Sequence, residues 1–464
     1  MTVFSWLVIL SLLFLCFWKS RCPKGFPPGP WHLPLIGNLL QVRMGNLLKD
    51  LDQLAKKYGP VFSLYLGGTP VVFTHGFPPA KEVLVIKGTE FAGRADFPIM
   101  DAINKKKGIL STKYGEVWKE QRRFSLMFLR NFGVGKKSME EKILEEATYL
   151  IEAFTEKTST FSGDRMGWMG NRHFSVHSLS MGHNSVDLQT DHWLYNAVLL
   201  VRRLPLPHQA LVTTAKKIDA FVEKEVEEHK ATMIPGEPRD FTDAYLEEMQ
   251  KAERKGSSFE EEQLRVLLSE LFIAGTETTA GTIQWGFLYL MAFPEIQVII
   301  MAGNSVSCYL VTSGAHLTGK YTNHVYMESV KCFPEGNRVL GSSEKCWKEI
   351  DTVLGNNASL KYEDRENLPY TNAVIHEIQR ISNVVPLGIP HAPIQDVQLF
   401  GYKIPKDTMV FVNLHSAHFD ESQWKFPDEF NPSNFLNEKG EFVNTEAFFA
   451  FSAGKYLSLS LSLS

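Results

Sequence analysis

The feature that most constrains this chain is a long apolar stretch at residues 264–293, whose spacing predicts a single helix. One face of that helix would carry Leu264, Leu267, Leu271, Gly275 and Thr278. A glycine inside a helix costs about 1 kcal/mol relative to alanine, so the Ala274–Gly275 pair needs a compensating use. Small side chains there would let a ligand approach the backbone, although close packing against another helix is the alternative. We therefore expect a fold built around this central helix.

Two polar side chains follow the small residues on the same helix. Thr278 can add its hydroxyl to the hydrogen bonds of the helix and open a groove. Glu277 supplies a carboxyl group that could pass protons toward bound oxygen. The middle of the helix is therefore a candidate catalytic segment.

Helices dominate the rest of the pattern. With 464 residues, 44% of them hydrophobic, the chain can bury a large core, and no Pro/Gly/Ser-rich linker divides it. Further helices are predicted at 47–58, 79–87, 114–130, 138–156, 208–232, 259–292 and 367–382, and strands at 61–67, 69–75, 384–389, 397–403 and 409–413. We therefore expect one large domain that is mainly α with small β-sheets.

Charge and cysteine content argue against several functional classes. The net charge of −4 and the pI of about 6.4 give no support for nucleic-acid binding, which needs a concentrated basic surface. The cysteines are Cys16, Cys22, Cys308, Cys332 and Cys346. Their odd number and lack of paired spacing predict neither a disulfide framework nor a zinc site, and fit a reducing compartment. His173 and His177 lie four residues apart, as metal ligands can, but no third ligand accompanies them.

The N-terminus carries a membrane-anchor pattern, an uncharged apolar run over residues 3–18 followed by Lys19 and Arg21. Basic residues after the run place its C-terminal side in the cytoplasm. A cleaved signal peptide is the alternative, but no basic region precedes the run and no small-residue cleavage site follows it. We therefore expect an anchor at 1–20 and a basic, Pro-rich hinge at 21–38.

Two further motifs place charged side chains on predicted helices. Glu377 and Arg380 are three residues apart, close enough to pair, and their apolar neighbours favour a partly buried ion pair over a surface one. Trp118 and Arg122 lie about one helical turn apart. An indole N–H and a guanidinium suit propionate or phosphate oxygens, with a plain amphipathic helix as the alternative.

Taken in order, the motifs are far more specific than any one of them. They are the Pro-rich hinge, WxxxR (118–122), AGTETT (274–279), ExxR (377–380), PSNF (432–435) and FSAGK (451–455). The chain resembles a microsomal cytochrome P450, a haem-thiolate monooxygenase, of the vertebrate family-2 group. The resemblance implies a cytochrome P450 fold over 39–455, a haem cofactor, and electrons from NADPH-cytochrome P450 reductase, with cytochrome b5 as a further partner. It also implies residence at the endoplasmic reticulum membrane, with the catalytic domain facing the cytoplasm.

The resemblance assigns roles to individual residues. Trp118, Arg122 and His391 would hold the haem propionates. Glu277 and Thr278 would be the acid and alcohol pair that delivers protons for oxygen–oxygen bond cleavage. The other residues expected against the haem are Ala274, Gly275, Phe451 and Gly454.

The same resemblance extends to the surrounding structure. Glu377 and Arg380 would form a structural network, which in the family closes onto a PERF-like segment; here Asn434 occupies the Arg position, so the third partner is weakened. The expected substrate contacts in an apolar pocket are Val385, Leu387 and Ile389. The candidates for a basic reductase-docking face are Lys119, Arg123 and Lys455.

The haem loop departs from the family at the iron ligand. After FxxGK the family continues as RxCxG, whose cysteine thiolate ligates the iron. This chain has Tyr456, Ser458 and Ser460 at the corresponding positions, and no cysteine follows Cys346. A neutral serine hydroxyl is a poor ligand, so we expect an aberrant tail at 456–464, a domain truncated before its ligand cysteine, and little retention of haem.

Two internal segments are also foreign to the family pattern. Residues 298–343 show no sustained helical period, and their removal would join the flanking sequence into one amphipathic helix, as expected of retained non-coding sequence. Residues 162–193 replace what should be helix above the substrate pocket. Both segments are expected to be either isoform sequence or errors of gene assembly.

Two classes of function therefore stay open. The first is a haem-dependent monooxygenase that inserts one oxygen atom from O2 into lipophilic substrates, such as arachidonate-like fatty acids or xenobiotics. The second is a non-catalytic, membrane-anchored truncated isoform, or a mis-assembled gene product, that cannot hold haem iron. The family resemblance favours the first class, and the serine at the position of the ligand cysteine favours the second class for this chain.

Overall fold

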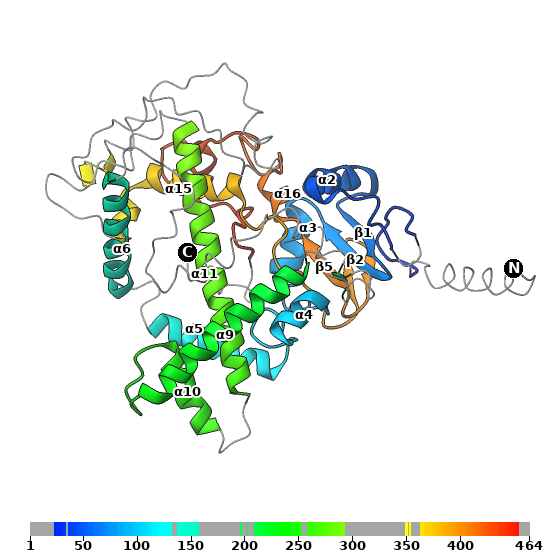
Figure 1. The fold of residues 1–464 in the computed structure, drawn as a ribbon. Coiled ribbons are helices and arrows are strands. Elements are labelled where there is room, and N and C mark those ends of the chain that lie inside the picture. The colour runs from blue at the N-terminus through cyan, green and yellow to red at the C-terminus, as the bar shows by residue number, and fades with distance from the viewer. Residues whose placement is uncertain are drawn as a thin grey trace, which may run out of the picture.

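The computed structural model describes residues 23–33, 36–131, 137–156, 195–196, 202, 208–252, 258–292, 349–350, 352–353 and 362–453. The helices are α2 (Leu47–Tyr58), α3 (Phe77–Lys81), α4 (Pro98–Asn104), α5 (Glu116–Asn131), α6 (Lys137–Glu156), α9 (His208–Thr232), α10 (Phe241–Ala252), α11 (Glu261–Ala292), α15 (Pro369–Ser382) and α16 (Leu414–His418). The strands are β1 (Val61–Leu66), β2 (Thr69–Thr74), β3 (Val397–Leu399), β4 (Tyr402–Ile404) and β5 (Met409–Val412). Helices dominate and the sheets are small, as predicted (Figure 1).

Several predicted features lie outside the described residues. They are the anchor 1–20, His173 and His177, the segments 162–193 and 298–343, Gly454, Lys455, and the tail 456–464 with Ser458. No helix in the described part of the chain is long and apolar enough to cross a bilayer. The Pro-rich hinge is mostly described, and the Pro28 carbonyl accepts the Ser63 N–H of β1 at 2.8 Å, so this segment packs along the sheet.

The larger sheet joins two distant parts of the sequence. β1 pairs antiparallel with β2, and β5 adds to β2 in parallel. The rings of Phe62, Phe73 and Phe411 stack across the three strands, with centroids 5.7 and 5.3 Å apart. Leu51 of α2 packs into the same cluster, so one face of the sheet is covered by that helix.

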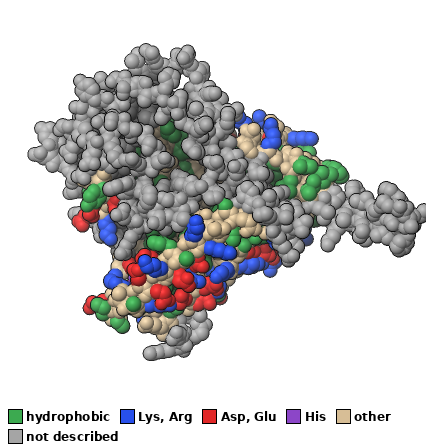
Figure 2. Space-filling model, viewed as in Figure 1, with side chains coloured by type: hydrophobic (Ala, Val, Ile, Leu, Met, Phe, Trp, Pro, Cys, Tyr) green, Lys and Arg blue, Asp and Glu red, His purple; other side chains and the backbone are tan. Residues whose placement is uncertain are grey.

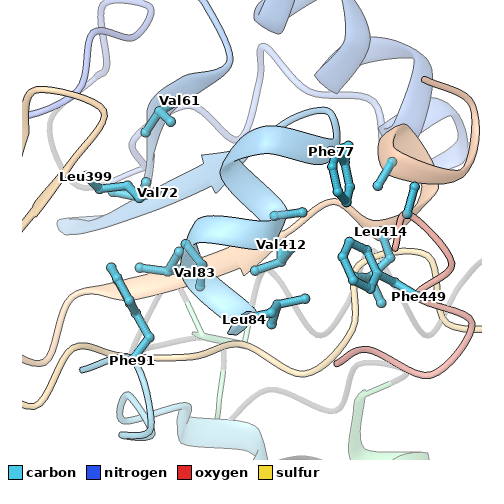
Figure 3. Packing of buried hydrophobic residues seen from close by; sticks show 14 of the residues in the cluster. Val61, Val72, Phe77, Val83, Leu84, Phe91, Leu399, Val412, Leu414 and Phe449 are labelled. Atoms are coloured by element: carbon cyan, nitrogen blue, oxygen red, sulfur yellow. The ribbon is translucent and has the colours of Figure 1, made fainter. Parts of the chain in front are cut away.

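A second apolar cluster connects the sheet to the segment that precedes the predicted haem loop. Val72 of β2 and Val412 of β5 meet Val83, which follows α3, and Phe449 (Figure 3). The rings of Phe77 and Phe449 stack with centroids 5.9 Å apart. The start of the loop is therefore fixed to the sheet by apolar packing.

The helical half of the domain surrounds the first turns of α11, where α9 crosses it and α5 and α10 lie beside it (Figure 1). Phe124 of α5 meets Tyr245 of α10 edge to face, with ring centroids 5.4 Å apart. Leu264 and Leu267 of α11 and Val226 of α9 complete the same buried cluster. The beginning of α11 is thus enclosed on several sides.

Ion pairs cover the outside of this half. Lys230 of α9 bonds Glu261 of α11 at 2.7 Å, and Arg265 lies 3.5 Å from Asp219. Figure 2 shows acidic and basic side chains intermixed over this face. The face is therefore mixed in charge rather than uniformly basic.

Two strand predictions were wrong in detail. Residues 384–389 form a turn, in which Pro386 has a fixed φ and the Gly388 N–H donates to the Val385 carbonyl at 3.1 Å. Gly388 has a φ of 57°, which interrupts an extended backbone. The predicted strand 397–403 is a hairpin of β3 and β4 that reverses at Phe400 and Gly401, both with positive φ.

Three of the described helices were missed by the sequence analysis, α4, α10 and α16. α10 has a clear start signal, since the side chain of Asp240 accepts the Asp243 N–H at 3.1 Å in an N-cap arrangement. Phe241 and Tyr245 then recur at helical spacing on its buried face. The capping residue and the spacing together could have identified this helix.

Candidate functional site

The middle of α11 is more open than its beginning. Residues 271–289 are mostly half-buried, and Ile273 is 41% exposed, whereas Leu264 is fully buried. Apart from the neighbouring residues and backbone of α11 itself, no atom of the described chain lies within 4 Å of where a Cβ on Gly275 would be. The small residues predicted to admit a ligand therefore border open space.

The two predicted catalytic residues lie on this open part of the helix. The Thr278 hydroxyl donates to the Ala274 carbonyl at 2.7 Å, the local hydrogen bond that the sequence suggested. Thr282 repeats the pattern, donating to the Thr278 carbonyl at 2.8 Å. Glu277, directly before Thr278, is half-buried. A side chain that bonds its own helix in this way can exchange that bond for a ligand at small cost.

Trp118 and Arg122 come together on α5, as predicted. Trp118 is buried, and the Arg122 guanidinium lies 5.5 Å from the centre of its ring. The indole N–H donates to the Ile109 carbonyl at 3.0 Å. The predicted donor therefore holds a backbone carbonyl in this structure.

His391 lies beside an arginine that the sequence analysis missed, Arg94. The Nδ1 of buried His391 bonds the Phe91 carbonyl at 2.9 Å, and residues 93 and 392 form a backbone bridge. Arg94 is 6% exposed and donates to the carbonyls of Leu110, at 3.1 Å, and Gly93, at 3.2 Å. The available signal was an arginine two residues after the apolar pair Phe91 and Ala92, where a surface charge is not expected.

This corner carries buried positive charge without an ionised partner. Burial lowers the pKa of Arg94 to about 10, so it stays charged at neutral pH. Burial raises the pKa of Glu270 to about 8, despite N–H donors from Ile109 and Leu110 and the charge of Arg94. Arg94 makes no salt bridge within the described residues. A carboxylate-bearing ligand such as a haem propionate fits here, because an unpaired buried charge is costly.

The ExxR residues form a complete ion pair. Glu377 and Arg380 are both fully buried and joined by two hydrogen bonds of 2.7 and 2.8 Å. The guanidinium also donates to four carbonyls, those of His418, Phe426, Pro427 and Glu429. Burial raises the pKa of Glu377, and the Arg380 contact opposes that rise. The pair therefore fastens α15 to the segment 418–429.

Asn434, predicted to be a weakened third partner, bonds both Glu377 and the segment beside it. The Asn434 amide donates to Glu377 at 3.1 Å and to the Phe426 carbonyl at 3.0 Å, and accepts the Phe426 N–H at 2.9 Å. The third partner is thus present as a neutral hydrogen-bonding group. An amide lacks the charge of arginine but is long enough here because the segment 431–435 lies directly against α15.

The end of the described chain leads toward the haem loop. Phe451 is buried, and the Ser452 N–H donates to the Phe449 carbonyl at 3.0 Å in a tight turn with a φ of 74° at Ser452. The Phe449 N–H donates to the buried His418 ring at 2.9 Å. The turn is therefore connected through His418 to the ion-pair network.

The predicted substrate residues lie on the turn at 384–389, beside α11. The side chain of Val384 would lie 3.4 Å from a Cβ on Gly281. Val385 and Ile389 are half-buried, while Leu387 packs against the sheet cluster around Phe411. The structure therefore brings this turn to the helix that carries the catalytic candidates.

The family with the description "Cytochrome P450" matches residues 27–176, 158–301 and 342–456. The chain belongs to the cytochrome P450 family. Cytochrome P450 2J2 of Homo sapiens is 37% identical over 476 residues, covering 98% of this chain and 85% of the human protein. Cytochrome P450 2J1 of Oryctolagus cuniculus is 38% identical (98% and 85%), and cytochrome P450 2J5 of Mus musculus is 36% identical (98% and 86%).

These relatives place the chain in the vertebrate family-2 group of cytochromes P450, which are haem-dependent monooxygenases. The expected cofactor is therefore haem. The described residues fit haem at its propionates, through Arg94 and His391, and along α11. The position of the iron ligand carries Ser458 and lies outside the described residues. The matched ranges leave 302–341 uncovered, a gap that falls within the atypical segment 298–343.

Proposed function

We propose that this cytochrome P450 inserts one oxygen atom from O2 into lipophilic substrates, with electrons from NADPH delivered by NADPH-cytochrome P450 reductase. The observation that carries the proposal is the buried, unbalanced charge of Arg94 beside His391, close in the fold to a helix that borders open space. Haem supplies the oxygen-activating chemistry when it is bound. The protein supplies orientation, an apolar surround and proton delivery.

Each residue at the site then has a definite task. Arg94 and Arg122 hold the propionates through guanidinium N–H groups, because such charged donors favour carboxylates. Trp118 and His391 shape the same corner, with their ring nitrogens bonded to the carbonyls of Ile109 and Phe91. Ala274 and Gly275 leave room for the ring. Thr278 and Glu277 move protons to the reacting centre, Thr278 by releasing its bond to the Ala274 carbonyl.

The substrate class follows from the apolar surroundings of the site. Val385 and Ile389 on the turn, and Ile273 on α11, offer hydrocarbon surface, and few polar groups would fix a polar substrate there. Arachidonate-like fatty acids and xenobiotics both suit such a surface. Membrane residence through the anchor at 1–20, at the endoplasmic reticulum and facing the cytoplasm, would deliver such substrates from the lipid phase.

The proposed partners are the reductase and cytochrome b5, which would dock on the side of the domain that carries α5. Lys119 and Arg123 belong to that helix, and both are exposed. Lys119 also bonds Glu116 at 2.8 Å, an exposed contact that a docking partner's carboxylate could replace at little cost.

A second candidate function rests on Ser458. Serine in place of the thiolate removes the electron donation that favours oxygen–oxygen cleavage. In that case the printed chain is a non-catalytic, membrane-anchored form or the product of a mis-assembled gene. Reading the messenger RNA across Gln297 and Glu344 and beyond Lys455 separates an isoform from an assembly error.

Spectroscopy of the full chain in membranes tests both candidates. Haem binding with a thiolate-type ferrous–carbonyl spectrum in the parent chain would reject the non-catalytic form. We expect instead no thiolate signature in the parent, and its appearance in Ser458→Cys. Ser462→Cys, a cysteine two Leu-Ser repeats further along the same sequence, is the matched control and should show none. Failure of Ser458→Cys to bind haem would contradict the proposed monooxygenase site.

A further inference from the structure

The side chain of Glu270 lies deep in the protein and has no task in the scheme above. It is 8% exposed and precedes Ala274 by one turn of α11. Its Oε2 accepts the Ile109 N–H at 2.6 Å, and both of its oxygens lie 3.2 Å from the Leu110 nitrogen. The amide of Asn104 donates to Oε1 at 3.2 Å. The carboxyl group thus binds the backbone segment that follows α4.

One peptide group of this segment is held at both ends. The peptide between Ile109 and Leu110 directs its N–H to Glu270 and its carbonyl to the indole N–H of Trp118, at 3.0 Å. The next carbonyl, that of Leu110, accepts Nε of Arg94 at 3.1 Å. A hydrogen bond at one end of a peptide polarises and orients the other end. The position of the two donor side chains therefore depends on the Glu270 contact.

The close approach of Glu270 is built into the backbone. Gly108 has a φ of 79°, and a Cβ there would lie 2.3 Å from Oε1 of Glu270. Gln263, two turns earlier on α11, bonds both the N–H and the carbonyl of Gly108 at 3.3 Å. A side chain at 108 would therefore displace the carboxyl group as well as strain the turn.

We infer that Glu270 is a positioning residue, whose carboxyl group clamps the segment Gly108–Leu110. The clamp sets the donor side chains of Trp118 and Arg94, and Arg94 keeps further N–H groups for the haem propionates proposed above. The inference rests on the proposed haem site for its functional meaning. Glu270 acts through the backbone of another segment and bonds neither proposed donor directly. One helix thus carries both the proton-delivering residues and the group that aligns the propionate donors.

Amide hydrogen exchange on the full chain measures the clamp directly. Glu270→Ala removes both acceptor oxygens, so exchange protection at Ile109 and Leu110 should fall about tenfold. Glu270→Gln keeps one acceptor and should give a smaller loss. Glu261→Gln is the matched control, since that carboxylate on the same helix bonds Lys230 and not the segment. Unchanged protection at both amides in Glu270→Ala would overturn the inference.

Haem titration, followed by absorbance, measures the consequence for the site. Affinity should fall about 10–100-fold in Glu270→Ala, as it does when groups that orient a ligand are removed, and should fall also in Gly108→Ala. The thermal midpoint of the haem-free chain shows whether a variant loses haem affinity through general destabilisation. General destabilisation would also lower exchange protection throughout the domain. Unchanged affinity in both variants would overturn the functional part of the inference. If the Ser458→Cys chain, the form used for these titrations, binds no haem, the proposed function is rejected, and amide exchange still decides the clamp.

Discussion

Arg380 and Arg94 are both buried, yet their surroundings differ in one decisive respect. Arg380 has a carboxylate partner, Glu377, at 2.7 Å and a set of backbone carbonyls around it. Arg94 has the carbonyls of Leu110 and Gly93 but no ion pair in the described part of the chain. A buried cation that the protein itself neutralises belongs to the fold. A buried cation that it leaves unbalanced indicates an anionic ligand.

Each arginine also has a buried histidine nearby. His418 gives its carbonyl to Arg380, and the pKa of its ring is lowered to about 3 by burial and then by the charge of Arg380. His391 lies near Arg94, and the pKa of its ring is lowered to about 3 by burial and then by the charge of Arg94. A carboxylate bound beside Arg94 would raise the pKa of His391 and leave the pKa of His418 unaffected. The comparison can therefore be tested at four residues.

The largest effect is expected from breaking the balanced pair. Glu377→Ala leaves Arg380 as an uncompensated buried charge and should lower the free energy of unfolding by about 3–5 kcal/mol. Urea unfolding of the haem-free chain measures this loss. Glu248→Ala is the control, because its partner Lys251 is exposed at the surface of α10. A loss no greater than that of the control would contradict the structural role of the pair.

The unbalanced arginine should behave in the opposite way. Arg94→Met removes a buried charge that has no ionised partner among the described residues, so the haem-free chain should keep or gain stability. Haem affinity should fall about 10–100-fold, because charge-assisted hydrogen bonds to a carboxylate are lost. Absorbance titration and thermal unfolding give the two readouts. Lys251→Met, at an exposed ion pair with Glu248 on α10, is the control and should change neither the haem affinity nor the stability. Clear destabilisation by Arg94→Met without a loss of haem affinity would reverse the assignment.

The histidines predict a dependence of stability on pH. Both rings titrate near 6.5 when unfolded and near 3 when folded, so between these values the unfolded chain binds more protons. The contribution of the neutral, buried rings to the free energy of unfolding is fully present above pH 6.5. It is lost as the pH falls, at about 1.4 kcal/mol per pH unit for each ring. Urea unfolding on either side of pH 6.5 measures the slope, which His391→Gln and His418→Gln should each reduce. Bound haem should reduce the part due to His391 only.

The smallest expected effect is at the third member of the balanced network. Asn434→Ala removes the amide that bonds Glu377 and Phe426, and should cost about 1–2 kcal/mol of unfolding free energy. Chemical denaturation gives the value. Asn437→Ala, at an exposed position that bonds Glu441, is the matched control. Equal losses in the two variants would mean that Asn434 adds nothing specific to the network.

Local patterns in the sequence predicted the elements that depend on local spacing. The helix at 47–58 and the helix at 208–232 were predicted with the bounds that the structure gives, because apolar residues recur at helical intervals. The turn at 384–389 was missed because its β-branched residues favour a strand, while Pro386 and Gly388 determine the actual backbone. The proline and the glycine of this turn therefore determined the backbone more strongly than the strand propensity of their neighbours.

The sequence predicted the site residues that lie together in one short motif, and it missed the residues that meet only when the chain folds. Trp118 with Arg122, and Glu377 with Arg380, each lie within one helix, so their spacing was visible. Arg94 and Glu270 have no such signal, because their partners lie on other segments of the chain. Hydrogen bonds between distant backbone segments cannot be read from spacing alone.

The parallel pairing of β2 with β5 has a consequence for how the chain matures on the ribosome. Val72 aligns with Val410, so the sheet cannot be completed until most of the polypeptide has been synthesised. The N-terminal hairpin must wait with one edge unpaired, a state that favours aggregation. High contact order of this kind slows folding. Chaperone protection during synthesis is therefore expected to matter more for this domain than for one whose strands pair in sequence order.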